Sequence, residues 1–192
     1  MDKKKLALEN PPQQPTVVSL ATTSDAEGIL NVVYQTWLAT YPNEEAGITK
    51  EDIEDQFAKP RSDEGLQKRR EEIENQPTNE RWFVARKGEK IVGVCRVRRT
   101  ETKNELLVLY VLPEYQRTNV GNALWSEARK FLDVTKDTIV KTTEYSVGAI
   151  NFYKKLGFQD TGERFQHEGS RMKSGAMFPE MTLVLKATQS GE

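Results

Sequence analysis

The densest group of residues that could perform chemistry lies in a polar turn over residues 114–119. The apolar run Leu106–Leu112 predicts a buried strand before this turn, and Pro113 ends the strand. The start of a helix exposes unpaired backbone N–H groups and the positive end of its dipole, and Gly121 lets a ligand come close to that backbone. The stretch therefore predicts a cradle for a phosphate group. The apolar residues that recur at helical spacing after the turn are Val120, Leu124, Ala128, Phe131 and Leu132.

Two common phosphate-binding motifs do not fit this turn. A Walker loop ends in Gly-Lys followed by Ser or Thr, and no such sequence occurs here. A dinucleotide-binding fingerprint needs three spaced glycines, whereas this stretch contains only Gly121.

Composition excludes several classes of function. The 192 residues carry 28 basic and 29 acidic side chains, so there is no general attraction to nucleic acid or to an anionic membrane. Cys95 is the single cysteine and His167 the single histidine, so we expect neither an internal disulfide nor a metal site. No apolar run has the length of a signal-peptide core or a membrane span, and we expect a cytoplasmic protein.

The remaining elements alternate between strands and helices. A helix capped by Ser24 or Asp25 should follow the first strand, and Thr49 with Asp52 predicts a capping box. Strands are expected over 16–21, 81–86, 91–98, 106–112, 137–143, 158–165 and 178–186. Further helices are expected over 50–57, 65–75 and 147–156. This order predicts a single α/β (α+β) domain with a mixed, mostly antiparallel sheet of about seven strands and helices on both faces.

Two blocks of sequence resemble the GNAT N-acetyltransferase family. Residues 109–124 are similar to its acetyl-CoA loop, Q/R-x-x-G-x-G/A between a strand and a helix, with Asn119 in place of the first glycine. Residues 146–158 look like its N-x-x-A-x-x-x-Y-x-x-x-G-F helix, with Ser146 in place of the asparagine. The early Trp37-x-x-x-Tyr41-Pro42 is also similar to many small members. The matching positions in the two blocks are Gln116, Gly121, Ala149, Tyr153, Gly157 and Phe158.

The resemblance implies a domain over 16–187. The charges and prolines of residues 1–15 predict a flexible tail, and a second tail is expected over 188–192. It implies that two parallel strands, ending near Val111 and Thr143, splay apart to admit acetyl-CoA. No metal is implied. The residues implied to bind this cosubstrate are Leu109, Tyr110, Val111, Gln116, Arg117, Thr118, Asn119, Val120, Gly121, Asn122, Ser146, Asn151 and Tyr153.

The resemblance also implies catalytic roles. Tyr153 occupies the position of the acid that protonates the leaving thiolate. Glu105 coincides with a family general base, and its spacing of six residues from Val111 predicts the same strand face. Glu144 competes for the role of base, whereas Lys141 stands at the other common base position and is a poor base unless its pKa falls.

The sequence does not identify the acceptor amine. We expect a small-molecule or peptide amine, a monomer or homodimer, and acceptor contacts from Trp37 and Tyr41, which could equally be core residues. The 63–74 helix and the 167–178 loop are further candidate walls. The predicted function is acetyl-CoA-dependent N-acetyl transfer by direct attack in a ternary complex. The alternatives are a non-catalytic acyl-CoA sensor and an interaction protein using residues 60–80.

Overall fold

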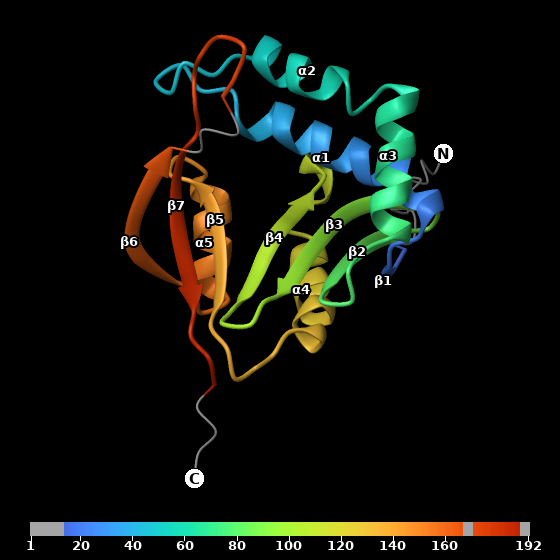
Figure 1. The fold of residues 1–192 in the computed structure, drawn as a ribbon, viewed down its shortest axis with the longest axis vertical. Helices are drawn as coiled ribbons and strands as arrows, with labels where there is room; N and C mark the ends of the chain where they lie inside the picture. The colour runs from blue at the N-terminus through green and yellow to red at the C-terminus, as the bar shows by residue number, and fades with distance from the viewer. Residues whose placement is uncertain (1–13, 167–170, 189–192) are drawn as a thin grey trace, which may run out of the picture.

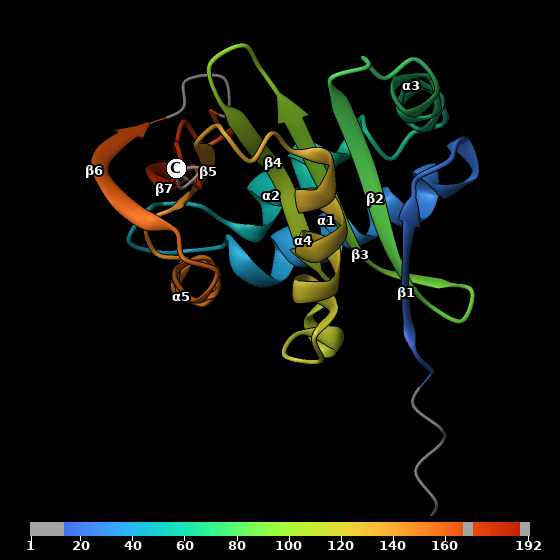
Figure 2. The ribbon, with the colours of Figure 1, turned by 90° about the horizontal axis from the view of Figure 1, so that it is seen from below.

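A single twisted sheet organises the molecule (Figures 1 and 2). The computed structural model of the chain describes residues 14–166 and 171–188. The sheet has seven strands in the order β1-β2-β3-β4-β5-β7-β6, and only β4 and β5 are parallel neighbours, as the sequence predicts. The strands are β1 (Thr16–Leu20), β2 (Glu80–Lys87), β3 (Lys90–Arg99), β4 (Asn104–Val111), β5 (Thr138–Thr143), β6 (Gln159–Gln166) and β7 (Pro179–Leu185).

Helices cover both faces of this sheet. α1 and α3 pack against one face with α2 beside α1, while α4 and α5 pack against the other (Figure 2). The helices are α1 (Ala26–Thr40), α2 (Lys50–Ala58), α3 (Asp63–Glu74), α4 (Val120–Phe131) and α5 (Val147–Lys155). Two short 3-10 turns precede α1 and α4, over Thr23–Asp25 and Pro113–Tyr115. No helix within the described ranges is long and apolar enough to cross a lipid bilayer.

Local sequence signals explain most of these boundaries. Thr49 and Asp52 form the expected capping box at the start of α2. The cap before α1 lies slightly earlier than expected, because Thr22 and Asp25 form a capping box around the 3-10 turn. Ser24 contributes only a hydroxyl contact to Thr22. Most of the two expected tails lies outside the described residues, so the boundaries at 16 and 187 stay predictions.

The amphipathic stripe of α4 supplies the centre of the largest core cluster. Val120, Leu124 and Ala128 are each at most 1% exposed, and they pack against the sheet as their spacing predicts. Trp125 joins this cluster, where its ring lies 5.6 Å from that of Phe158. α4 is thereby fixed against the strands that carry the site.

β4 and β5 pair for only part of their length. Their register runs from Asn104↔Thr138 to Leu106↔Val140 and stops there. β5 continues beside β7 as far as Thr143↔Glu180, so the two parallel strands diverge toward α1 (Figure 1). This is the splayed pair that the family resemblance implies.

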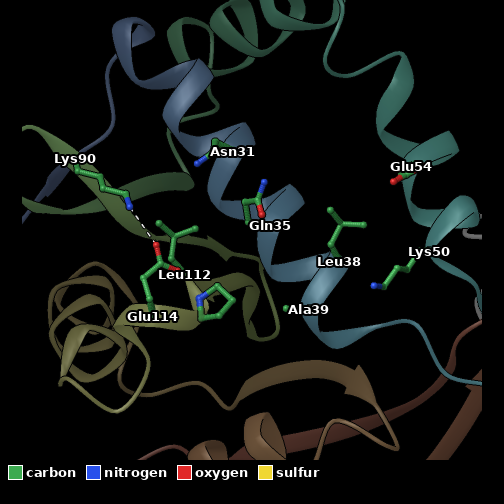
Figure 3. A pocket seen from close by; sticks show the side chains of 10 residues that line it. Asn31, Gln35, Leu38, Ala39, Lys50, Glu54, Lys90, Leu112 and Glu114 are labelled. Atoms are coloured by element: carbon green, nitrogen blue, oxygen red, sulfur yellow. Dashed lines mark hydrogen bonds and ion pairs between the residues drawn. The ribbon is translucent and has the colours of Figure 1, made fainter.

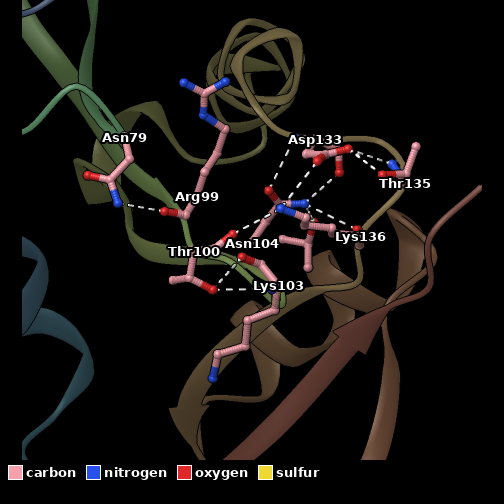
Figure 4. A network of polar contacts seen from close by, with 9 residues as sticks. Asn79, Arg99, Thr100, Lys103, Asn104, Asp133, Thr135 and Lys136 are labelled. Carbon is pink, nitrogen blue, oxygen red and sulfur yellow. Dashed lines mark hydrogen bonds and ion pairs between the residues drawn. The ribbon is translucent and has the colours of Figure 1, made fainter.

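A buried asparagine closes the other end of the pair (Figure 4). Asn104 is 1% exposed, and its amide nitrogen donates to the carbonyls of Asp133 and Lys136 and to the hydroxyl of Thr138. Its side-chain oxygen accepts from the N–H of Asp133 at 3.1 Å. Because these bonds bind the start of β4 to the α4–β5 connection, the pair stays closed here while it opens at the far end.

Candidate functional site

The opened edge of β4 carries the first part of the site. Leu112 donates its N–H to the Val92 carbonyl, and Tyr110 pairs with Val94, so these residues direct their backbone groups toward β3. Backbone direction alternates along a strand, and Leu109 and Val111 therefore direct theirs toward the opening. An extended, peptide-like chain can pair with those groups.

The carbonyl of Val111 is already engaged on this edge. It accepts from the side-chain amide of Gln116 at 3.2 Å and from the hydroxyl of Thr36 at 3.4 Å. Sequence reasoning missed Thr36, although a signal was present. Thr36 follows Ile29 and Val32 at helical spacing, so it is a polar residue on the buried stripe of α1. Such a residue needs a buried hydrogen-bond partner.

The turn before α4 has the backbone conformation of an anion cradle. Arg117 and Asn119 have φ of 61° and 69°, the left-handed region, and Asn119 is the N-cap of α4. The sequence interpretation that Asn119 can stand where a glycine is expected is thus confirmed in conformation. Its side-chain oxygen accepts from the Asn122 amide at 2.8 Å, and the Thr118 hydroxyl donates to the Tyr115 carbonyl. Left-handed residues before a helix turn successive N–H groups toward one point, which suits a phosphate.

Gly121 has a packing reason besides ligand approach. A Cβ at this position would lie 3.2 Å from two ring carbons of Phe152, so the Phe152 ring would have to shift by a few tenths of an ångström to admit a side chain. The glycine therefore allows the Phe152 ring of α5 to pack closely on the start of α4.

Tyr153 lies in the main core cluster, against which Leu109 and Val111 pack. Its residue is 6% exposed, and its ring contacts those of Phe152 and Phe158 at centroid distances of 5.6 and 5.7 Å. Burial raises the pKa of the Tyr153 phenol well above its usual value, and the neighbouring Tyr110 and Cys95 raise it further. The phenol is therefore neutral and carries a proton that it can donate. Cys95 is fully buried and packs as a small hydrophobic residue, as expected.

The structure corrects the placement of Glu105. A β-bulge between Leu106 and Val108 adds one residue, so Leu106, Leu109 and Val111 all face the α4–α5 side and Glu105 faces the opposite side from Val111. Glu105 pairs with Ile139 at the closed end of the splayed strands. Two cations hold its carboxylate, with Arg98 at 2.7 Å and Lys103 at 3.3 Å.

The charge around Glu105 also makes it a weak base. Burial raises its pKa, but hydrogen bonds and charges from Arg98 and Lys103 outweigh burial, and the net pKa is below the usual value. A carboxylate stabilised in this way holds a proton less readily than an ordinary glutamate does.

The other candidate bases lie near the open end of β5. Glu144 follows this strand, donates its N–H to the Pro179 carbonyl and lies 3.8 Å from Arg164. Lys141 places its ammonium 4.7 Å from the centre of the Phe165 ring. The roles of Glu144 and Lys141 in catalysis stay predictions.

Two predicted cofactor-binding residues near the start of α5 differ in their exposure. Ser146 is 6% exposed, and its hydroxyl contacts that of Thr143, so it stabilises the β5–α5 turn. Asn151 is exposed one turn along the helix. Both flank the open end of β5, where the resemblance implies contacts to the cofactor arm.

The predicted acceptor residues belong to an aromatic cluster. Trp37 lies edge-on to Tyr41, Phe57 and Phe178, with the Tyr41 centroid at 4.9 Å. Tyr41 accepts a hydrogen bond from the Tyr145 hydroxyl at its carbonyl. Both predicted residues are thus packed, yet they lie where α1 reaches the opening.

The sequence also suggested α3 and the 167–178 loop as walls of the acceptor site. α3 covers β2, because Ile73 and Arg69 pack on Trp82, and β3 separates β2 from β4. The helix therefore lies away from the opening, and its expected role as an acceptor wall stays a prediction. In the 167–178 loop, residues 167–170, including His167, lie outside the described residues. Met172 and Phe178 are buried against α1 and α2, and Ser174 binds Asp52.

A groove of about 560 Å³ runs beside the end of β4 (Figure 3). It lies between α1, the start of α2 and the residues that follow β4, and Lys90 pairs with Glu114 on its rim. Its volume is within the usual range for small-molecule sites. The lining residues are Asn31, Gln35, Leu38, Ala39, Lys50, Glu54, Lys90, Leu112, Pro113 and Glu114.

These features fit acetyl-CoA. The backbone edge at Leu109 and Val111 suits the pantetheine amides, and the left-handed turn at 117–119 suits the pyrophosphate. Within residues 14–166 and 171–188 there is no cluster of three or more metal-ligating side chains of the kind that binds a metal ion.

Comparison with known proteins agrees with this geometry. The sequence profile of the acetyltransferase (GNAT) domain matches residues 37–174. The fold is similar to that of PaiA N-acetyltransferase from Thermoplasma acidophilum in complex with coenzyme A, at 21% identity over 90% of this chain and 99% of that one, with a TM-score of 0.65.

Two further structures share the fold at lower identity. The ribosomal-protein-S18-alanine N-acetyltransferase of Escherichia coli is 16% identical over 93% of this chain and 97% of its own, with a TM-score of 0.59. YncA of Salmonella typhimurium, with its cofactor acetyl-CoA, is 16% identical over 92% and 96%, with a TM-score of 0.61. At these identities the likeness shows the fold alone.

The splayed strands, the cradle and the matched domain define an acyl-CoA-dependent transferase. The chain belongs to the GNAT acetyltransferase family, and it is an N-acetyltransferase that uses acetyl-CoA.

Proposed function

We propose that this protein transfers the acetyl group of acetyl-CoA directly to a primary amine while both are bound, through a domain that spans residues 16–187. The observation that carries the proposal is the opening between β4 and β5, which exposes the backbone of Leu109 and Val111 beside the buried phenol of Tyr153. A ternary complex gains its rate from holding amine and thioester together in one orientation.

In this proposal each part of the site has one task. Acetyl-CoA supplies an acetyl group activated as a thioester. The N–H groups of Leu109 and Val111 pair with the pantetheine arm and polarise the acyl carbonyl. Residues 116–122 bind the pyrophosphate, with Ser146 and Asn151 beside the arm. The neutral phenol of Tyr153 donates its proton to the departing sulfur.

The experiment separates cofactor binding from transfer. The melting temperature is measured with increasing CoA, since a ligand that binds only the folded state at 100 times its Kd adds about 2.7 kcal/mol of stability. Release of free thiol from acetyl-CoA is then followed with a panel of primary amines. Stabilisation by CoA together with amine-dependent thiol release supports the proposal, and absence of CoA binding refutes it.

One observation favours a second function, a non-catalytic acyl-CoA sensor. Lys141 stands at a common position of the family's base, and Glu105 is held by two cations. If CoA stabilises the protein and no amine on the panel releases thiol, the sensor is the better description.

A further inference from the structure

The C-terminal end of α1 lies between the two arms of the opening (Figure 1). The arms are the parts of the chain beyond the last β4–β5 pair, Leu106↔Val140. Tyr110 lies on the β4 arm, and Tyr145 lies on the other arm, just after β5. Because the β4–β5 register stops at that pair, backbone bonds between the two strands do not fix their separation at this level. The separation therefore depends on side-chain contacts.

Tyr41 makes such contacts with both arms. It is the C-cap of α1, and Pro42 follows it, so the helix ends there. The last carbonyl groups of a helix lack partners within the helix. The carbonyl of Tyr41 accepts from the hydroxyl of Tyr145 at 2.9 Å, and the hydroxyl of Tyr41 lies 3.0 Å from that of Tyr110. We call Tyr41, Tyr110 and Tyr145 the tyrosine clamp.

Packing holds the clamp in one arrangement. The Tyr41 ring lies 4.9 Å from the Trp37 ring and 4.9 Å from the Phe178 ring. Tyr145 packs against the same hydrophobic cluster, which joins α1, α2 and the segment before β7. Tyrosine side chains have only two rotatable bonds before the hydroxyl, so a packed tyrosine loses little freedom when it makes a contact. The clamp is therefore a rigid connection between the arms.

The clamp lies at the level of the acyl group. In the function proposed above, the N–H groups of Leu109 and Val111 pair with the pantetheine arm and polarise the acyl carbonyl. Tyr110 lies between these two residues, and its side chain packs on the α1 side of the sheet. The space for the acyl chain is therefore bounded by two arms whose separation the clamp fixes.

We propose that Tyr110 and Tyr145 are positioning residues, which act through Tyr41 to fix the width of the opening and to limit the acyl group to a short chain. This inference rests on the function proposed above. An opening that is held at one width is preorganised, so acetyl-CoA binds without the cost of ordering the two arms. A longer acyl chain needs the arms to move apart, because packed side chains leave little free space, and that movement breaks a bond of the clamp.

The first test removes one bond of the clamp from either side. Tyr41→Phe and Tyr110→Phe each delete a hydroxyl of the same bond and keep the ring, while the Tyr41 carbonyl still accepts from Tyr145. We expect each change to lower kcat/KM for acetyl-CoA about 3- to 10-fold at saturating amine. The double variant should be no worse than either single variant. Losses that multiply in the double variant, or unchanged kcat/KM in all three, overturn the inference.

The second test measures acyl-chain selectivity with acetyl-CoA and butyryl-CoA. The wild-type protein should have at least a tenfold higher kcat/KM for acetyl-CoA, and equal values overturn the inference. Tyr110→Phe and Tyr145→Phe should each reduce this ratio at least threefold, because loosened arms separate more easily. A change that only destabilises the fold lowers both values alike and leaves the ratio unchanged. A wild-type ratio in both variants therefore also overturns the inference.

Tyr34→Phe is the matched control for both tests. Tyr34 lies on the same helix, packs on Phe57 and carries the Arg61 guanidinium on its ring face. Its kcat/KM and its acyl-chain ratio should equal those of the wild type. The melting temperature of each variant without ligand shows that the variant is folded.

Binding of CoA separates this inference from the function on which it rests. If CoA stabilises the wild type, an amine releases thiol from acetyl-CoA and the clamp variants match the wild type, this inference alone is overturned. If CoA does not stabilise the wild type, the proposed function is overturned and this inference with it.

Discussion

The hydroxyl groups of Tyr41 and Tyr110 lie 3.0 Å apart and join the end of α1 to β4 at the point where β4 has left β5. A strand that loses a neighbour on one side needs other contacts to hold its position. Tyr110 supplies one, and the bond from Thr36 to the Val111 carbonyl supplies another. α1 therefore holds β4 in place without closing the edge that the cosubstrate needs.

Tyr153→Phe should reduce turnover without weakening cofactor binding. The change removes only the hydroxyl, and the ring keeps its contacts with Phe152 and Phe158. Loss of a general acid lowers kcat by about 100-fold or more. Thiol release gives kcat, and calorimetry gives the Kd for CoA.

Tyr34→Phe is the matched control for that measurement. Tyr34 lies on α1, packs on Phe57 and carries the Arg61 guanidinium on its ring face, away from the splayed strands. Its kcat should equal that of the wild type. A Tyr153→Phe variant with unchanged kcat would remove Tyr153 from the mechanism.

Asn119→Val should weaken CoA binding, whereas Asn119→Gly should preserve it. Asn119 has φ of 69°, and a β-branched residue in the left-handed region costs about 1–2 kcal/mol. If the turn relaxes, the N–H groups before α4 no longer converge, and the Kd rises about tenfold. Equal Kd values for the two variants would show that the left-handed turn does not bind the pyrophosphate.

Asn104→Ala should lower the free energy of unfolding by about 2–4 kcal/mol, because it removes buried hydrogen bonds and leaves carbonyl groups without partners. Asn79→Ala is the control, since Asn79 is exposed and donates one bond to the Arg99 carbonyl. The control should cost less than 1 kcal/mol. Urea unfolding measures both, and equal losses would contradict a special role for Asn104.

The sequence predicts an element correctly where one short pattern of residues is enough to specify its structure. Val120, Leu124 and Ala128 recur at the spacing of an α-helix, and Thr49 and Asp52 have the spacing of a capping box. Both predictions are confirmed in the structure. The left-handed Asn119 is also confirmed, because a glycine-like position in a motif restricts the backbone.

Features that depend on pairing between strands distant in sequence could not be predicted from short sequence patterns. The bulge next to Leu106 is one extra residue relative to β3, and no local pattern reports it, so Glu105 was assigned to the wrong face. The register of β7 on β5 pairs residues 37 apart in sequence, as in Thr143↔Glu180, and spacing along the chain does not report it either.

Asp52→Asn should destabilise the protein at pH 7 and less so in acid. Burial raises the pKa of Asp52, but bonds from Thr49 and from the N–H and hydroxyl of Ser174 outweigh it, and the net pKa is below the usual value. A lowered folded-state pKa adds stability that is fully present above the unfolded value of about 3.9. That stability is lost as the pH falls through the folded-state pKa.

The difference in unfolding free energy between wild type and Asp52→Asn should therefore be constant from pH 7 to about pH 5 and shrink below about pH 4. Urea unfolding at several pH values measures it. Asp55→Asn is the control, because Asp55 also binds the 171–178 loop, through an exposed pair with Lys173 at 3.0 Å. An exposed pair contributes about 0–1 kcal/mol. A pH-independent difference for Asp52→Asn would mean that its carboxylate charge does not hold this loop to α2.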